Sequence, residues 1–198
     1  SPAIFLIHGY GSHMDDLFAF APYLSDKHTI IALEAPFSMG PDSYAWYAFE
    51  YDEYGGLQAN NVQAMEVIAC LIVNIKNLCR DHALEENDLT LLGFSQGAIL
   101  SYAIALTYPE KISKVVALSG YFNQEIAPEV MDTKAISHLK FFISHGTVDQ
   151  VIPVDWARKA QPFMQNLGLN TMYKEYPIGH GVAPQNFYDF KNWLEATK

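Results

Sequence analysis

The stretch GFSQG at residues 93–97 places a serine, Ser95, between two glycines. A short apolar run at 89–94 leads into it, and an apolar helical pattern follows it. This context of strand, sharp turn and helix, with the pattern G-x-S-x-G, is typical of a nucleophile elbow, which exposes the serine oxygen at the carboxyl end of a strand. A serine becomes an effective nucleophile only when a base lies within hydrogen-bond reach. The elbow therefore predicts a nucleophile that needs partners elsewhere in the chain.

Two residues downstream supply those partners. Asp149 follows the apolar run at 140–145, and His180 follows the apolar run at 171–176. His180 would take the proton of Ser95 and return it to the leaving group, and Asp149 would orient the imidazole. The chain order of serine, aspartate and histidine is that of one of the known triad arrangements. The sequence therefore predicts a catalytic triad for acyl transfer.

Other acids and histidines have simpler explanations. Asp155 is the nearest alternative to Asp149, but it follows Pro153 at a predicted helix start, where a carboxylate has a structural role. His8 and His145 end apolar runs in turns of small residues and are expected to organise those turns. No carboxylates and histidines stand at a recognised ligand spacing, so we expect no metal. Surface or packing roles are expected for the remaining histidines, His13, His28, His82 and His138.

Acyl transfer also needs donors for the negative oxygen that develops during attack. Residues 7–12 (IHGYGS) form a glycine-rich turn after the first apolar run, a suitable place for an exposed backbone N–H. The backbone amide of Gln96, directly after the nucleophile, is the expected second donor. The sequence thus predicts an oxyanion hole between the first turn and the elbow.

The elements that must position these residues alternate along the whole chain. Apolar runs predict strands at 3–8, 29–33, 89–94, 114–119, 140–145 and 171–176. Helical periodicity predicts helices at 15–25, 59–82, 96–107, 154–167 and 184–197. This alternation predicts an α/β fold, a mainly parallel sheet of about six strands with helices on both faces, in a single domain at 1–198. All three triad residues then follow carboxyl ends of strands, where open α/β sheets place their sites.

Composition and charge exclude several classes. The 198 residues are 50% hydrophobic and 17% charged, as in ordinary globular proteins, and carry a formal charge of −10. Such an acidic balance disfavours nucleic acids and anionic membranes as partners. We see no segment approaching the ~20 apolar residues of a membrane span. Cys70 and Cys79 fall on opposite sides of one predicted helix and cannot pair with each other, and two free thiols favour the cytoplasm.

Two connections, 34–58 and 121–137, are too long for simple loops. Ordered insertions of this length at a sheet edge commonly shape a binding site. The first is rich in aromatic residues, which suit packing of the segment onto the body as well as they suit a binding site, and a homodimer contact stays open. Candidates for the wall of an apolar substrate pocket are Tyr44, Trp46, Tyr47, Phe49, Tyr51 and Phe122.

Taken together, these residues resemble the phospholipase/carboxylesterase branch of the α/β-hydrolases, which includes acyl-protein thioesterases. The matching segments are HGYG at 8–11, GFSQG at 93–97, ALSGY at 117–121, HGTVD at 145–149 and GH at 179–180. The resemblance implies the α/β-hydrolase fold, cofactor-free hydrolysis of esters or thioesters, and oxyanion amides from Tyr10 and Gln96. The sequence starts at the strand that carries the predicted oxyanion turn, so we expect the family's usual leading strands to be either absent or removed. Its segment AWYAF at 45–49 also matches the family's tryptophan loop only loosely.

The favoured function is a serine carboxylesterase or thioesterase that acts on a small-molecule ester or thioester with an apolar acyl group. The alternatives are a peptidase or lysophospholipase on the same fold, or a non-catalytic binding protein that kept a hydrolase fold. Non-catalytic members usually lose a triad residue, and none is missing here, which favours the enzyme.

Overall fold

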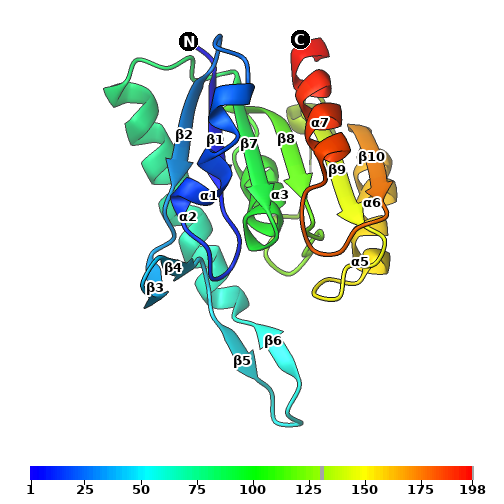
Figure 1. Cartoon of the computed structure of the whole chain (residues 1–198). Helices are drawn as coiled ribbons and strands as arrows, with labels where there is room; N and C mark the ends of the chain where they lie inside the picture. Colours follow the sequence, from blue (N-terminus) through cyan, green and yellow to red (C-terminus); the bar gives the residue numbers. More distant parts are fainter. Residues whose placement is uncertain (130–131, 198) are drawn as a thin grey trace.

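The computed structural model describes residues 1–129 and 132–197, arranged around one twisted six-stranded sheet (Figure 1). All its strands are parallel, in the order β10-β9-β8-β7-β1-β2. The strands are β1 Ala3–Ile7, β2 Thr29–Leu33, β7 Leu89–Phe94, β8 Ile112–Leu118, β9 Lys140–Gly146 and β10 Asn170–Tyr176. The prediction of a six-stranded parallel sheet is confirmed, and each strand lies within two residues of its predicted start and end.

Burial of the strands explains their sequences. Every residue of β1 is buried, and β7 and β8 are nearly so, whereas the edge strand β2 is half-buried throughout. Central strands of a parallel sheet are covered on both faces, so both sets of alternating side chains must be apolar. The continuous apolar runs that predicted these strands are the consequence of that burial.

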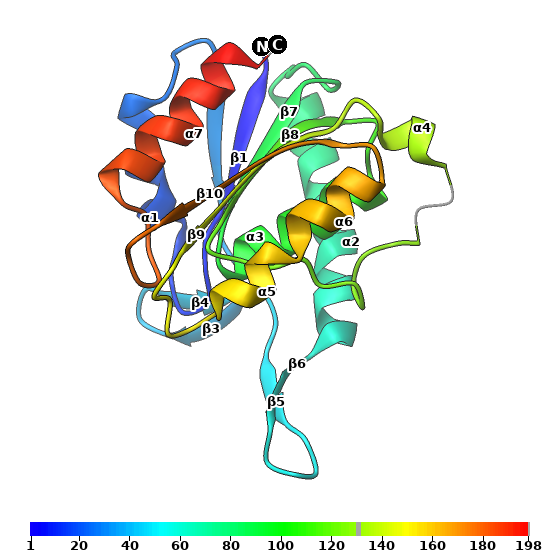
Figure 2. The same ribbon diagram turned by 90° about the vertical axis from the view of Figure 1, so that its right-hand side faces the viewer.

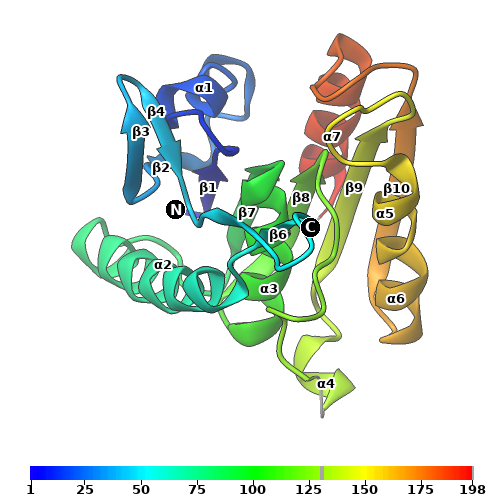
Figure 3. The same cartoon turned by 90° about the horizontal axis from the view of Figure 1, so that it is seen from below.

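Helices cover both faces of the sheet (Figures 2 and 3). The short helix α1 (Met14–Phe18) and the last helix, α7 (Pro184–Ala196), lie on one face. The other face carries α2 (Asn61–Asp81), α3 (Gln96–Thr107) and α6 (Ala160–Asn166). Side chains of β1 alternate between the two layers: Phe5 belongs to the core under α2 and α3, and Leu6 to the core under α1 and α7.

Two predicted helices are shorter than expected, and a proline explains each break. The helix predicted at 15–25 consists of α1 and a single 3₁₀ turn, Ala21–Tyr23, which contains Pro22. The helix predicted at 154–167 is divided into α5 (Val154–Arg158) and α6, because Pro162 has no N–H to donate to the preceding turn.

The aromatic segment 34–58 contains two hairpins where no regular structure was expected. Strands β3 (Phe37–Gly40) and β4 (Ser43–Ala45) pair antiparallel, as do β5 (Phe49–Tyr51) and β6 (Leu57–Ala59). Strands of three or four residues are too short to show a period of two in the sequence. Both hairpins lie at the carboxyl edge of the sheet, and β5–β6 projects from the body (Figure 1). The other long connection, 121–137, contains a short helix, α4 (Thr133–Ile136), and its residues 130–131 lie outside the described part.

Helix α2 corrects one expectation about membranes. Among the described residues it is the helix long and apolar enough, by length and composition, to cross a bilayer, with a mean hydropathy of 1.5 over its most apolar window. Core helices of water-soluble proteins meet the same criterion, and α2 buries one face, including Val67, Leu71 and Ile75, in the core. The expectation that no segment is long and apolar enough to span a membrane was therefore wrong. That the chain does not span a membrane stays a prediction.

Candidate active site

The turn between β7 and α3 gives Ser95 an unusual backbone. Its φ of 54° and ψ of −116° lie where side-chain-bearing residues are rarely found, a conformation that costs about 1–3 kcal/mol and clusters at functional sites. The flanking glycines permit the turn: a Cβ on Gly97 would lie 1.9 Å from the carbonyl oxygen of Ile7, and one on Gly93 would lie 2.3 Å from that of Gly97. The nucleophile-elbow geometry therefore depends on both glycines of the pentad.

Ser95, His180 and Asp149 are joined by hydrogen bonds. His180 Nε2 lies 3.0 Å from Ser95 Oγ, and His180 Nδ1 lies 2.7 Å from Asp149 Oδ2. With the proton on Nδ1, the imidazole donates to the carboxylate and accepts from the serine hydroxyl, which is the arrangement a general base needs. Strands β7, β9 and β10 deliver the three residues to one edge of the sheet. His180 is thus hydrogen-bonded to a serine 85 positions and to an aspartate 31 positions before it in the chain.

Asp149 is held as an ionised carboxylate. Its Oδ1 accepts the backbone N–H groups of Val151 and Ile152 at 2.8 and 2.9 Å, and its side chain is fully buried. Burial by itself raises the pKa of Asp149, but the hydrogen bonds from His180 and from these two amides outweigh it and leave the pKa below its ordinary value. The carboxylate is therefore charged wherever the protein is folded near neutral pH.

This lowered pKa predicts a pH dependence of stability. A group whose pKa is lower in the folded state stabilises the fold above its unfolded pKa, about 3.9 for aspartate, and that contribution is lost as the pH falls through the folded pKa. We expect the difference in unfolding free energy between wild type and Asp149→Asn to be largest near pH 6 and to shrink below about pH 4. Urea denaturation across this range measures it, and a difference that does not vary with pH would contradict the assignment.

Two backbone N–H groups at this edge are free to bind an anion. Within residues 1–129 and 132–197, neither the amide of Tyr10 nor that of Gln96 has a hydrogen-bond acceptor. The loop after β1 runs directly against the elbow, since a Cβ on Gly9 would lie 3.3 Å from Ser95 Cβ. Both amides are therefore unpaired in the described part of the chain, and their role as oxyanion donors stays a prediction.

His8 and His145 organise their turns, as expected. The buried ring of His8 donates from Nδ1 to the Gly9 carbonyl at 2.8 Å and accepts the Ala35 N–H on Nε2 at 3.1 Å, and burial lowers its pKa. His145 Nε2 lies 2.8 Å from the Ile152 carbonyl oxygen, across the turn that carries Asp149. Asp155, the alternative acid, is instead exposed and pairs with Arg158 at 2.8 Å within α5.

The predicted pocket residues divide between core and surface. Trp46 and Tyr47 are each 1% exposed and belong to the core, and Phe122 packs on Phe163 with ring centroids 4.4 Å apart. Phe49 and Tyr51 are exposed on β5. Tyr44 pairs through its backbone with Ser12. Packing therefore accounts for most of these rings, and their role toward a substrate stays a prediction.

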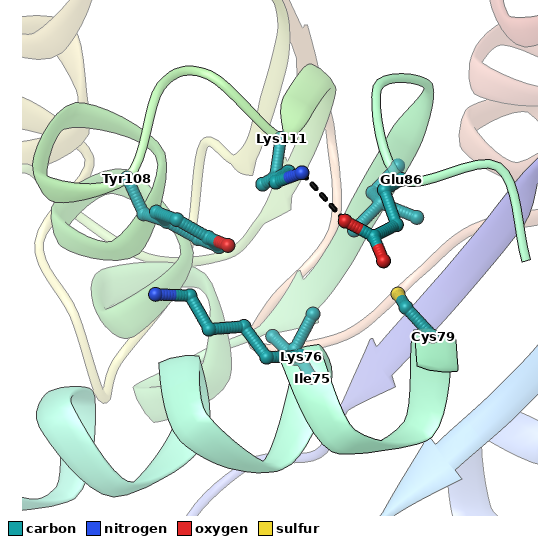
Figure 4. Close-up of a pocket in the computed structure, with 7 residues that line it drawn as sticks. Ile75, Lys76, Cys79, Glu86, Tyr108 and Lys111 are labelled. Carbon is teal, nitrogen blue, oxygen red and sulfur yellow. Dashed lines mark hydrogen bonds and ion pairs between the residues drawn. The ribbon is translucent and has the colours of Figure 1, made fainter. Parts of the chain in front are cut away.

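Two cavities lie away from Ser95. One, of about 250 Å³, is lined by Trp46 together with Phe37 of β3 and residues of α2 that include Leu71. The other, of about 10 Å³, lies at the opposite end of β7, where Lys111 pairs with Glu86 near Cys79 and Lys76 lies over the Tyr108 ring (Figure 4). The second is barely large enough for one water molecule and cannot hold a substrate. In the described part of the chain, no three histidine, cysteine or acidic residues gather to hold a metal ion.

A family model and several curated proteins match the sequence of this chain. A family model described as Phospholipase/Carboxylesterase matches residues 1–198. A probable carboxylesterase of Oryza sativa subsp. japonica is 30% identical over an alignment of 115 residues, and the match covers 54% of this chain and 41% of that protein. Acyl-protein thioesterase 1 of Debaryomyces hansenii is 31% identical over an alignment of 124 residues, and the match covers 61% of this chain and 53% of that protein. The chain spans about half the length of the curated relatives it matches.

Solved structures show the same fold. The crystal structure of esterase PE8 aligns with a TM-score of 0.83 at 24% identity and covers 100% of this chain and 93% of its own. The carboxylesterase of Bacillus cereus aligns with a TM-score of 0.87 at 14% identity and covers 100% of this chain and 89% of its own. The six-stranded sheet with its two helical layers is thus an α/β-hydrolase fold.

Proposed function

Because the chain belongs to the Phospholipase/Carboxylesterase family, we propose that it hydrolyses carboxylic esters or thioesters of apolar acyl groups through an acyl-serine intermediate. The observation that carries this proposal is the hydrogen-bonded line from Ser95 through His180 to Asp149. The two free amides beside it, of Tyr10 and Gln96, support the same reaction. Relatives named carboxylesterase and acyl-protein thioesterase support the ester and thioester classes.

The proposed reaction has two steps. Ser95 Oγ attacks the acyl carbon while its proton passes to His180 Nε2, and Asp149 stabilises the imidazolium that forms. The Tyr10 and Gln96 amides bind the oxygen of the tetrahedral intermediate. Collapse expels the alcohol or thiol, which takes the proton from His180. Water then attacks the acyl-serine while its proton passes to His180, and the second tetrahedral intermediate collapses to release the carboxylic acid as Ser95 Oγ takes that proton from His180.

A series of p-nitrophenyl esters from acetate to laurate tests the reaction and its acyl preference. We expect kcat/KM to rise from acetate to a maximum at a longer chain, since each buried methylene contributes about 0.8 kcal/mol. A flat profile would contradict the apolar acyl group. Negligible hydrolysis throughout, with no labelling of Ser95 by a fluorophosphonate, would instead indicate a non-catalytic binding protein.

Parallel assays separate the alternative activities. A peptide amide, a lysolipid and an acyl thioester place different leaving groups on the same acyl-serine chemistry. Faster turnover of the peptide or the lysolipid than of simple esters would replace the proposed substrate class with that of a peptidase or lysophospholipase.

We also propose the domain organisation and the cellular location of the enzyme, and an experiment on its oligomeric state. It is a single domain over residues 1–198, since one continuous sheet joins its first and last strands. Cys70 and Cys79 are unpaired thiols, which suits the cytoplasm. Sedimentation would distinguish a monomer from a homodimer that buries the exposed aromatic rings of β5–β6.

A further inference from the structure

The side chain of Gln96 uses both ends of its carboxamide on one short segment. Its Oε1 accepts the backbone N–H of Trp46 at 2.8 Å, and its Nε2 donates to the carbonyl of Tyr47 at 2.8 Å. Gln96 is 2% exposed, so water does not compete for these bonds. Only a side chain with a donor and an acceptor at this length makes both, which neither methionine nor glutamate can do. Gln96, the first residue of α3, thus binds the backbone of Trp46 and Tyr47, which lie just before the projecting β5–β6 hairpin.

The same segment is bonded to the turn after β1. Trp46 donates from its indole Nε1 to the carbonyl of His8 at 2.8 Å. Two residues earlier, Tyr44 accepts the N–H of Gly11 at 2.8 Å and donates its own N–H to Ser12 at 2.8 Å. The segment 44–47 therefore lies between two parts of the site and is hydrogen-bonded to each.

These contacts connect the two free amides. The Tyr10 amide lies on the turn after β1, and the Gln96 amide lies on α3, so their separation is set by contacts between elements rather than by the chain. Trp46 is bonded on one side to His8, two residues before Tyr10, and on the other to the Gln96 side chain. We call these two hydrogen bonds of Trp46, to Gln96 and to His8, the bridge. Loss of either bond would let the distance between the Tyr10 and Gln96 amides change.

We infer that Gln96 is a positioning residue: its carboxamide, acting through Trp46, holds the two oxyanion amides at the spacing that the transition state requires. The inference rests on the proposed function. It assigns the side chain of Gln96 a role separate from that of its own backbone amide. Oxyanion donors must lie within hydrogen-bond distance of where the charge develops, and a displacement of about 1 Å costs about 100-fold in rate.

Gln96→Met, which keeps the length of the side chain and removes both bonds, tests the inference. We expect kcat per active site to fall about 10- to 100-fold, with KM within about threefold of wild type. Affinity for a trifluoromethyl ketone, which forms the tetrahedral adduct on Ser95, should fall in parallel with kcat/KM, as for a transition-state analogue. Active sites are counted by burst titration, so molecules that fail to fold do not enter the comparison.

Gln63→Met is the matched control. Gln63 on α2 also accepts a backbone N–H of this region, that of Ala48, and within the described residues no hydrogen bond joins it to residues 93–97. We expect its kcat per site and its affinity for the ketone to stay within about twofold of wild type. If Gln96→Met behaves like Gln63→Met, or if its loss is confined to the number of titratable sites, the positioning role is refuted.

Trp46→Phe tests the other end of the bridge and does not depend on the folding of Gln96→Met. It removes the bond to His8 and keeps an aromatic ring, and we expect the same loss of kcat and ketone affinity without a matching change in KM. Because both residues act through one bridge, the double variant should lose less than the product of the two single losses. Additive losses would overturn the inference. A wild-type protein that neither titrates nor hydrolyses any ester would refute the proposed function itself, and the inference would fall with it.

Discussion

Replacing Ser95 with alanine is expected to reduce ester hydrolysis by at least about 10⁴-fold and to abolish labelling by a fluorophosphonate. Alanine removes the hydroxyl oxygen that lies 3.0 Å from His180 Nε2, and it leaves the base without a proton to accept. The backbone of the elbow tolerates alanine as well as it tolerates serine, because both carry a Cβ. The loss should therefore appear in kcat and not in folding, as measured by steady-state kinetics and by thermal unfolding.

Ser101→Ala is the control for this prediction. Ser101 is a buried serine on the same helix, and its hydroxyl donates to the Gly97 carbonyl at 2.7 Å instead of to a histidine. Its removal should leave both labelling and kcat within about twofold of wild type. Labelling that persists in Ser95→Ala would show that another residue is the nucleophile.

Replacing Asp149 with asparagine is expected to lower kcat by about 10⁴-fold while the fold is kept. The reason lies in how the carboxylate is held. Oδ1 accepts the Val151 and Ile152 amides, so an asparagine keeps its oxygen there and turns its NH₂ toward His180 Nδ1. That nitrogen must then accept, and the ring carries its proton on Nε2, facing Ser95. The histidine can no longer take the proton of the serine.

Asp155→Asn separates this explanation from a general effect of charge. Asp155 is the other acid that the sequence offered, and it pairs with Arg158 on the surface. We expect kcat for this variant to stay near wild type, because exposed ion pairs such as that of Asp155 with Arg158 contribute little to folding stability. A larger loss in Asp155→Asn than in Asp149→Asn would mean that the acid has been misassigned.

Most of the sheet was predictable because its strands are buried on both faces. Continuous apolar runs such as AIFLI and LTLLGF are typical of strands that are covered on both faces, and they predicted the position of all six strands. The hairpins of segment 34–58 were missed because strands of three or four residues carry no readable period. Helix ends were misplaced where Pro22 and Pro162 interrupt a pattern that is otherwise helical.

For the site, the order of motifs predicted which residues meet but not what else holds them. Ser95, Asp149 and His180 each follow a strand, and parallel strands bring their carboxyl ends to one edge, so their approach follows from topology. The carboxamide of Gln96 escaped notice because its role depends on two backbone groups 49 and 50 residues earlier in the chain. Glutamine after the nucleophile was the available signal, but its partners have no signature in side-chain type.

The sequence by itself determined which residues meet at one edge of the sheet and the class of chemistry that we propose for them, because a serine, a histidine and an aspartate that each follow a strand can be read along the chain. Only the tertiary structure decided how Trp46 and Tyr47 are used. Their rings are buried in the core, and their backbone is bonded to Gln96, because hydrogen bonds between distant backbone and side-chain groups depend on three-dimensional packing and not on spacing along the chain.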